Sequence, residues 1–510
     1  MRRERQRGCP GSPRAEAKGG PMIPALRPKL ELLSPALMDR ILDEAFLILG
    51  RDGVFFENAE ARALFREAGQ RVDETAQRVR LSRDLVERSL ETTPPSLTLY
   101  DRSGEKSFHV GGDEVHFDPG SSGTRILDHD TLRERRPNTA DLAGIARLTE
   151  VLDHLHFQST SLVPADVPGG IADDYRLYLS LLFGTKPVVT GTFRTAGFRP
   201  MHEMLCAVRG GAEALKAKPL AIFDACPSPP LRWSLLTSQS LIDCARAGIP
   251  SELISMGMTG ATSPATIAGT LVQHVVENLA GLTLAQLAYP GAPVIFGGSP
   301  SSFDMRQGTT PMGAMETMMI DCAYAQLGKR MKLPTHAYMA LSDAKTNDAQ
   351  AGYETGIGAV LAALAGINVV SGPGMLDYES TISLEKLVID DEICALAYRL
   401  IDGVVLREEV LAAHLFEGFG PQTNFLTMPH TRKWYRKEHL VPIVADRELY
   451  DAWEARGASS IADRAAGRVA DLLEKNPPRL PESGLASELR RIMEADARAN
   501  GVTALPRLPD

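Results

Sequence analysis

Short apolar segments recur along the chain, and each is followed by a stretch with the spacing of an amphipathic helix. Short runs rich in Val, Ile, Phe and Thr indicate buried strands, whereas apolar residues at i, i+3, i+4 and i+7 indicate helices. The predicted strands cover residues 156–160, 187–191, 220–224, 253–256, 293–297, 335–339 and 367–371. Repetition of one strand–helix unit in this way is typical of a parallel barrel.

The predicted barrel helices follow these strands in turn. They cover residues 171–183, 201–209, 233–247, 265–288, 314–331, 349–365 and 384–401. We assign the eighth strand to residues 424–427, ahead of a helix that begins at Thr431. The fold class is therefore α/β, a TIM (β/α)8 barrel. Because the chain of 510 residues exceeds a bare barrel of about 250, we expect additional segments around it.

The same pattern divides the chain into four parts. Residues 1–30 are rich in Arg, Gly and Pro and are predicted to form a disordered tail without the apolar core of a secretory signal. Residues 31–150 form an N-terminal α+β extension, with helices at 35–50, 58–68, 73–76 and from Ser82, and a hairpin over 108–118. Residues 151–440 form the barrel, and residues 441–510 a C-terminal helical segment.

Composition and charge exclude several classes of protein. A net charge of -9 argues against a nucleic-acid-binding surface. The six cysteines are scattered without a C-x-x-C pair, so neither a disulfide framework nor a structural zinc site is predicted. No apolar run is long enough to span a membrane. These features fit a cytoplasmic enzyme with free thiols.

Polar and glycine-rich residues gather where the predicted strands end, which is where barrel enzymes place their active sites. They occupy residues 190–193, 257–260, 297–299 and 372–379. Glycine there permits close approach of a ligand, although ordinary turns also use it. We find neither a G-x-x-x-x-G-K-[ST] phosphate loop nor a G-x-S-x-G nucleophile turn.

The sixth strand and the loop after it are the densest polar stretch. Buried polar groups at a strand end need partners, and a ligand is one option. Asp348 is expected to cap the following helix. Asp224, Cys226 and His336 could be drawn together as a metal set, but a packed histidine and a buried thiol explain them better, so no metal site is predicted. The candidate site residues from this stretch are His336, Tyr338, Asp343, Tyr353 and Glu354.

Two segments of the chain resemble a known family. Residues 341–354 read Leu-Ser-Asp-Ala-Lys-Thr-Asn-Asp-Ala-Gln-Ala-Gly-Tyr-Glu, and residues 362–375 read Ala-Ala-Leu-Ala-Gly-Ile-Asn-Val-Val-Ser-Gly-Pro-Gly-Met. Both resemble the trimethylamine methyltransferase family of corrinoid-dependent amine demethylases, as do residues 293–297 and 429–431. The resemblance implies a barrel that transfers a methyl group from a methylated amine to cobalt(I) on a separate corrinoid protein.

Leu341 departs from the family pattern. Members that act on trimethylamine carry pyrrolysine just before the Ser-Asp pair, at the position that Leu341 holds here. Pyrrolysine is thought to hold a tertiary amine as an adduct, which leucine cannot do. The resemblance therefore points to the pyrrolysine-lacking branch, similar to glycine betaine methyltransferase, with a quaternary amine as substrate. Asp343 and His336 remain the catalytic candidates.

A quaternary nitrogen leaves as a neutral tertiary amine, so the protein needs no general acid and must mainly hold the cation and aim one methyl group. Aromatic rings and carboxylates suit a methylated ammonium. The possible walls are Phe193, Phe296, Tyr338, Tyr353 and Tyr378, and the possible counter-charges are Asp343, Glu354 and Glu379. His336 and Lys345 are candidates to bind a carboxylate of the substrate.

The partners follow from the same resemblance. Corrinoid-carrying domains use a D-x-H-x-x-G motif, which this sequence lacks, so we expect no tightly bound cofactor and a corrinoid on a cognate partner protein. We also expect a homo-oligomer that contacts neither nucleic acid nor membrane. Two alternatives stay open: a barrel enzyme of other chemistry on the same scaffold, or a non-catalytic betaine-binding protein.

Overall fold

Parallel strands form a closed ring at the centre of the computed structural model, which describes residues 24–408 and 410–509. Around the ring they are β9 (Gln158–Ser159), β10 (Val188–Thr190), β11 (Ala221–Ala225), β13 (Ser251–Ser255), β15 (Val294–Gly298), β17 (His336–Tyr338), β18 (Val369–Ser371) and β6 (His116–Asp118). A parallel bridge from Phe296 to Thr335 joins β15 to β17. Another, from Phe117 to Leu155, joins β6 to β9 and closes the barrel.

The eighth barrel strand is not where the sequence pattern placed it. Residues 424–427 form no strand and lie in an exposed turn. The eighth strand is β6, which precedes the first predicted strand and lies in the region expected to be an extension. The prediction was wrong because β7 and β8 separate this short strand from its helix, so the segment lacks the strand–helix pattern, and two of its three residues, His116 and Asp118, are polar.

An antiparallel hairpin closes the lower end of the barrel. It pairs β4 (Ser96–Tyr100) with β5 (Ser107–Gly111), so the predicted hairpin over 108–118 was also wrong. The apolar side chains of this hairpin cluster with the lowest inward-facing residues of the barrel strands. The cluster comprises Leu97, Leu99, Phe108, Val110, Phe157, Val189, Ile222, Ile295 and Val369. Burial of these side chains leaves the opposite end, at the carboxyl ends of the strands, as the mouth.

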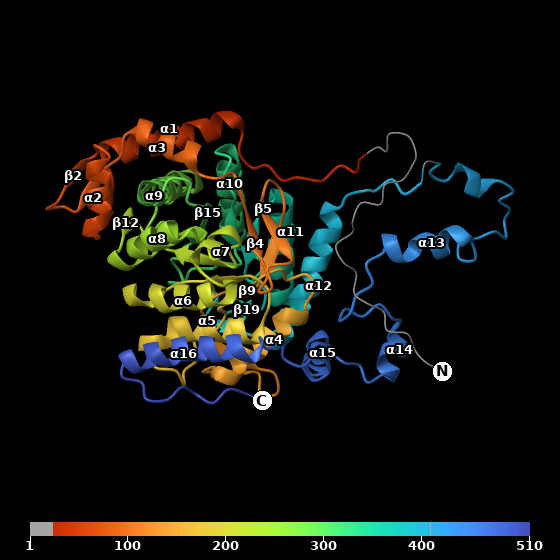
Figure 1. The fold of residues 1–510 in the computed structure, drawn as a ribbon. Helices are drawn as coiled ribbons and strands as arrows, with labels where there is room; N and C mark the ends of the chain where they lie inside the picture. Colours follow the sequence, from red (N-terminus) through yellow and green to blue (C-terminus); the bar gives the residue numbers. More distant parts are fainter. Residues whose placement is uncertain (1–23, 409, 510) are drawn as a thin grey trace.

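A helix follows each barrel strand. In chain order these are α4 (Thr139–Val151), α5 (Ala172–Phe183), α6 (Phe198–Arg209), α8 (Leu235–Ala247), α9 (Ile267–Ala288), α10 (Met315–Arg330), α11 (Ala349–Ala365) and α12 (Leu384–Ile401), with the short α7 (Ala212–Ala217) after α6. In Figure 1, α5, α6, α8 and α9 lie one above another, and α10 to α12 lie on the other side. Asp348 caps α11 as expected. The seven predicted strands and the helices after them are confirmed.

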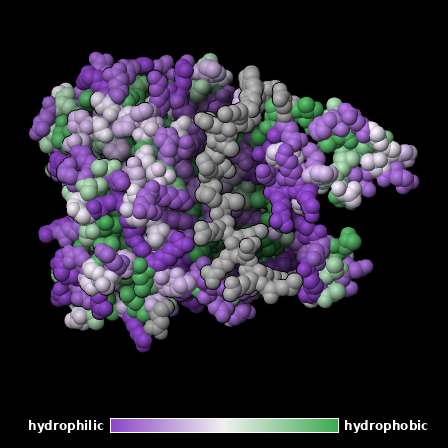
Figure 2. Space-filling view, turned by 45° about the vertical axis from the view of Figure 1, so that its right-hand side comes forward, coloured by the Kyte–Doolittle hydropathy of each residue, from purple (hydrophilic) through white to green (hydrophobic). Residues whose placement is uncertain are grey.

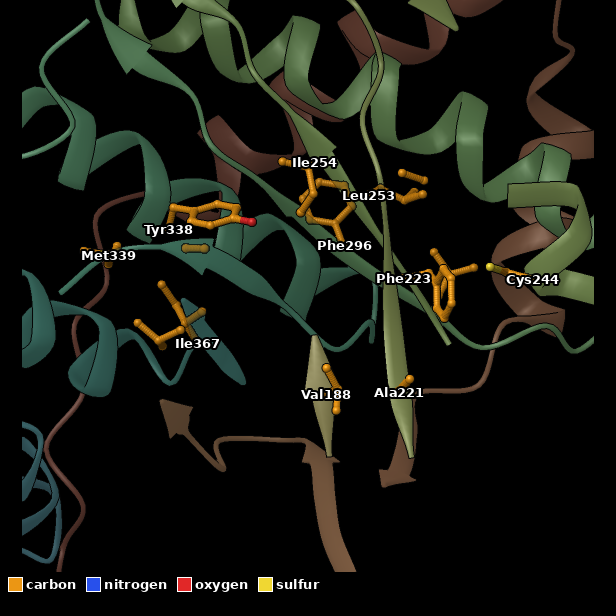
Figure 3. Close-up of a cluster of buried hydrophobic side chains, with 14 of the residues drawn as sticks. Val188, Ala221, Phe223, Cys244, Leu253, Ile254, Phe296, Tyr338, Met339 and Ile367 are labelled. Atoms are coloured by element: carbon orange, nitrogen blue, oxygen red, sulfur yellow. The ribbon is translucent and has the colours of Figure 1, made fainter. Parts of the chain in front are cut away.

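Strand side chains that face outward fill the layer between strands and helices. Figure 3 shows Val188, Phe223, Leu253 and Phe296 in this layer. Burial of such side chains stabilises each by roughly 1.5–3 kcal/mol. Because apolar packing occupies the outer side of the strands, the polar strand residues described below face the barrel interior.

The N-terminal layer covers α9. It contains α1 (Pro35–Arg51), β1 (Val54–Phe56), α2 (Ala59–Glu67), β2 (Arg71–Asp73), β3 (Arg78–Arg80) and α3 (Arg83–Thr92), and β1 also pairs with β12 (Arg232–Trp233). Ser82 caps α3 as expected. The helix expected over 73–76 is instead the turn between β2 and β3. The disordered tail expected over 1–30 lies mostly outside the described residues, and at its end the Leu30 N–H donates to the Leu364 carbonyl.

Two small sheets surround the mouth. One joins β19 (Met375–Leu376), β20 (Thr381–Ile382), β7 (Arg125–Asp128) and β8 (Arg133–Arg135), and the other pairs β14 (Met258–Thr259) with β16 (Ser301–Ser302). Both are built from segments that follow barrel strands. The loops at the mouth are therefore held by strand pairing rather than left as free coil.

The C-terminal part is helical, as predicted. It contains α13 (Pro429–Glu438), α14 (Tyr450–Ala455), α15 (Ile461–Lys475) and α16 (Ser483–Ala499). Helix α15 packs on α12 and α4, and α16 lies along α5 and α6. Residues 403–408 and 410–449, which we call the arm, stand largely away from the barrel in Figure 1 and carry hydrophobic patches in Figure 2. Near its end the arm returns to α12, where the Val444 N–H donates to Glu392. Among the described residues, no helix has the length and apolar character needed to cross a bilayer.

Candidate functional site

A cavity of about 310 Å³ lies at the mouth of the barrel. Parallel barrels place their active sites at this end, because the loops after the strands converge there. Residues from the ends of several strands line the cavity, and they come from segments far apart in the sequence. They are Ser121, Ser122, Gly191, Thr192, Phe193, Asp224, Cys226, Leu236, Thr237, Ser240, Ile254, Met256, Ser299, Tyr338 and Glu379.

Two aromatic rings form part of the wall. Tyr338 is the last residue of β17 and is buried, and Figure 3 shows its hydroxyl directed toward the strand that carries Ile254. Phe193 follows β10 and is 44% exposed, with the guanidinium of Arg176 at 4.7 Å from its ring centre. The guanidinium covers one face of the Phe193 ring, and both rings line the cavity. Such walls favour an ammonium cation.

Asp224 and Glu252 form a carboxyl pair at the base of the cavity. They lie directly opposite each other on β11 and β13 and share a hydrogen bond. Burial raises the pKa of Asp224 to about 6 and holds the pKa of Glu252 well above its usual range. Glu252 therefore keeps a proton near neutral pH and donates it to an ionised Asp224, which is the member of the pair that reaches the cavity.

A chain of polar residues continues below this pair. The Ser371 hydroxyl donates to Asp118 Oδ1 at 2.9 Å, and His336 Nε2 lies 3.2 Å from the same hydroxyl. His336 Nε2 is also 3.7 Å from Glu252 Oε1. Burial lowers the pKa of His336 to about 3, so its ring is neutral. His336 thus lies beneath the cavity rather than in its wall.

Glu379 reaches the cavity from a strained turn between β19 and β20. Asp377, Tyr378 and Glu379 have φ values of 49°, 55° and 66°, so three consecutive residues with side chains adopt the left-handed region. Each costs roughly 1–2 kcal/mol relative to the ordinary conformation. Lys345 holds the turn, because its Nζ lies 3.0 Å from Asp377 Oδ1 and 4.0 Å from the centre of the Tyr378 ring. Strain of this kind is often retained at functional sites.

The loop after β17 is fixed by two carboxylates that do not line the cavity. Glu354 Oε2 accepts hydrogen bonds from the Ser342 hydroxyl at 2.6 Å and from the Asp343 N–H at 2.8 Å. Asp343 accepts from the N–H groups of Met312 and Gly313 at 3.0 and 2.9 Å, and burial raises its pKa to about 6. The hydrogen-bonding capacity of both side chains is thus largely used by the backbone of the loop.

The structure brings Phe193, Tyr338 and Glu379 together at the cavity and places the other sequence candidates elsewhere. Phe296 faces the helices, where its ring packs against His274 and Tyr324. Tyr353 is 56% exposed on α11, and Leu341 is buried just after β17 without lining the cavity. Asp343, Glu354, Tyr378, His336 and Lys345 take part in the loop, turn and interior contacts described above.

Three residues near the cavity were not predicted as site residues. Asp224 and Cys226 were interpreted as part of the packed core, and Glu252 was not considered. A signal was present in the sequence. Asp224 and Cys226 follow Ile222 at intervals of two residues, so all three face one side of β11, and Ile222 belongs to the inward-facing cluster. A polar pair that continues an inward-facing row toward the carboxyl end of a strand indicates the mouth of a barrel.

Comparisons with known proteins place the chain among related sequences. A sequence model of the family described as trimethylamine methyltransferase (MTTB) matches residues 1–497. The chain is 33% identical to the trimethylamine methyltransferase MttB of Desulfitobacterium hafniense (strain DSM 10664 / DCB-2), over 89% of this chain and 92% of that protein. It is 32% identical to the glycine betaine methyltransferase of Desulfitobacterium hafniense (strain Y51), over 89% of this chain and 94% of that protein.

A solved structure is similar in fold. The monomethylamine methyltransferase MtmB of Methanosarcina barkeri superposes with a TM-score of 0.52 over 87% of this chain and 89% of that chain. The two sequences are 11% identical in this comparison, so the likeness concerns the fold alone.

Proposed function

The chain belongs to the trimethylamine methyltransferase family, and on this premise we propose that it moves a methyl group from a quaternary or N-methylated amine to cobalt(I) of a separate corrinoid protein. The observation that carries the proposal is the cavity at the barrel mouth. Its aromatic residues are Phe193 and Tyr338, and its acidic residues are Asp224, which is ionised near neutral pH, and Glu379, whose pKa burial holds well above its usual range. This combination suits a methylated ammonium, for which rings and anions replace water.

Leu341 supports a substrate that needs no covalent activation. It occupies the position where the resemblance to the family implies pyrrolysine in trimethylamine-specific members, and its side chain is apolar and buried. When a quaternary ammonium reacts, the carbon–nitrogen bond breaks and its electron pair stays on nitrogen, which leaves as a neutral tertiary amine. Cobalt(I) supplies the electron pair for the new bond to the methyl carbon. The chain's residues therefore need only bind, orient and desolvate the cation.

Asp224 and Glu379 have a defined role in this scheme. The negative charge of Asp224 compensates the ammonium, because a buried charge without a partner is costly. Without a bound cation, burial keeps Glu379 protonated, and a nearby ammonium favours its ionised form. The wall of Tyr338 and Phe193 limits the orientations of the bound cation. One methyl group can then point out of the mouth toward the acceptor.

The corrinoid acceptor belongs to the proposal as a partner protein. The sequence has no D-x-H-x-x-G motif of the kind that corrinoid carriers use, so the proposal places the corrinoid on another chain. The mouth lies at the end of the barrel opposite the hairpin β4–β5, and the strand-paired loops around it offer a surface on which such a partner could dock.

We also propose that the protein is a cytoplasmic homo-oligomer. Helix α13 and the short helix at Ala413–Phe416 in the arm have no buried residue, and large apolar side chains such as Val404 and Leu426 are exposed there. Exposed apolar surface on this scale commonly marks a protein–protein contact. Light scattering is expected to show more than one copy per particle, and a particle of one chain would contradict the proposal.

The test of the function uses the purified chain with a reduced corrinoid protein. Methylated amines are added singly, and the absorbance of cobalt(I) is followed. We expect loss of the cobalt(I) signal with at least one quaternary amine, together with release of the corresponding tertiary amine. Binding of a quaternary amine, measured by calorimetry, without any methyl transfer would favour a non-catalytic binding protein instead.

A further inference from the structure

Among the described residues, the cavity lining contains two acidic side chains and no basic one. Asp224 lies at its base and Glu379 at its rim. Glu252 and Asp118 are fully buried beneath them, and electrostatic interactions link all four groups. Apart from the hydrogen bond within the Asp224–Glu252 pair, Asp224 Oδ1 and both Glu252 oxygens have no hydrogen-bond partner in the described part of the chain.

No described cation reaches this cavity as a donor. Arg176 is fully buried, and its Nη2 donates to the Ser122 hydroxyl at 2.8 Å and to the Thr160 hydroxyl at 3.0 Å, while the Phe193 ring lies over the guanidinium. Arg176 is not among the residues that line the cavity, and its positive charge is directed to Asp224, with which it interacts electrostatically. Lys345 is occupied by the turn that carries Glu379, and His336 is neutral and lies below.

A carboxylate on the substrate would therefore be placed among carboxyl groups. Burying an anion without a cationic partner is costly, and nearby charges of the same sign increase the cost. A hydroxyl group on the substrate meets the opposite situation, because the ionised Asp224 accepts a hydrogen bond from it. Hydrogen bonds to a charged acceptor are stronger than those between neutral groups.

We infer that the substrate of this site is a methylated ammonium compound that carries a hydrogen-bond donor, such as an alcohol hydroxyl, and no carboxylate. The inference rests on the proposed function and narrows it: the cation is held by Tyr338, Phe193 and Glu379, and the donor is held by Asp224 at the base of the cavity. A cavity of about 310 Å³ has room for a small molecule of this kind.

Three trimethylammonium compounds separate the possibilities in the cobalt(I) assay. Choline carries a hydroxyl, glycine betaine carries a carboxylate, and tetramethylammonium carries neither. We expect kcat/KM for choline to exceed that for glycine betaine by about tenfold or more, with tetramethylammonium between them. A higher kcat/KM for glycine betaine than for choline would overturn the inference and leave the proposed function intact. No transfer from any methylated amine would instead remove the function.

The Asp224→Asn variant tests the residue that the inference depends on. It keeps the shape of the side chain and removes its charge, so the preference for choline over tetramethylammonium should shrink to about threefold or less. Glu213→Gln is the matched control, because Glu213 is an exposed carboxylate on α7 that does not line the cavity, and it should leave the preference unchanged. Thermal melting establishes that both variants are folded. A folded Asp224→Asn variant with the full preference for choline would overturn the inference.

Discussion

Asp224 and Glu252 are paired residues of adjacent parallel strands, and they share one hydrogen bond at the base of the cavity. Two buried carboxyl groups so close together cannot both ionise at low cost, so their pKa values move apart. Glu252 holds the proton, and Asp224 is left as the negative group that a bound cation meets. This relationship explains why the base of the cavity carries a negative charge.

The first prediction concerns pH. Because the pKa of Asp224 is raised to about 6, the carboxyl is neutral below that pH and a cationic substrate loses its counter-charge. We expect kcat/KM for a quaternary amine to fall as the pH is lowered through about 6 and to stay level above it. Asp224→Asn should remove this limb of the pH profile. A limb that persists in the variant would show that another group is responsible.

The second prediction concerns the aromatic wall. Replacing Phe193 with leucine keeps apolar volume at the mouth but removes the ring. Because a cation–π contact contributes about 0.5–2 kcal/mol, kcat/KM should fall by roughly 3- to 30-fold. Phe193→Tyr, which keeps a ring, is the control and should retain most of the activity. Equal kinetics for the leucine and tyrosine variants would exclude a role for the ring.

The third prediction concerns the strained turn. Lys345→Met keeps the length of the side chain and removes the ion pair with Asp377 that holds Glu379 in place. We expect a lower kcat/KM for the variant, with little change in melting temperature, since Lys345 lies at the surface. In a variant that already carries Glu379→Gln, Lys345→Met should lower kcat/KM almost no further, because Lys345 acts only by positioning Glu379. Additive losses in this cycle would contradict a positioning role.

The fourth prediction separates structural from functional carboxylates. Glu354→Ala removes the acceptor of two hydrogen bonds in the loop after β17, so the free energy of unfolding should fall by about 2–4 kcal/mol. Chemical denaturation measures this loss. Tyr353→Ala, at the neighbouring exposed position, should change the unfolding free energy by less than about 0.5 kcal/mol. Comparable destabilisation by both substitutions would show that the loop is not fixed by Glu354.

Much of the barrel could be predicted from the sequence, because seven strand segments recur at similar intervals and each is followed by a helix with regular apolar spacing. Strand β6 could not, since His116 and Asp118 are polar residues that face a polar interior. The three predicted residues that line the cavity, Phe193, Tyr338 and Glu379, all lie in or after predicted strands. Local position at a strand end is visible in a sequence, which is why these residues were recognised.

The remaining features of the site depend on contacts across the fold. The pairing of Asp224 with Glu252 requires the register of two strands, and the placement of Glu379 requires a left-handed turn that ordinary preferences oppose. The loop-fixing role of Glu354 depends on the path of the chain after β17. Polar residue type alone could not separate these roles, so Asp343 and Glu354 were grouped with residues of the cavity.

Transfer of an isotopically labelled methyl group tests the central claim most directly. A quaternary amine labelled with ¹³C in its N-methyl groups is incubated with the protein and a reduced corrinoid protein, and both products are analysed by mass spectrometry. We predict one labelled methyl group on the corrinoid for each tertiary amine released, and strong reduction of both in Asp224→Asn. As a control, a different methyltransferase must be able to methylate the same corrinoid protein. If that control succeeds, an unlabelled corrinoid and an intact amine would contradict the account.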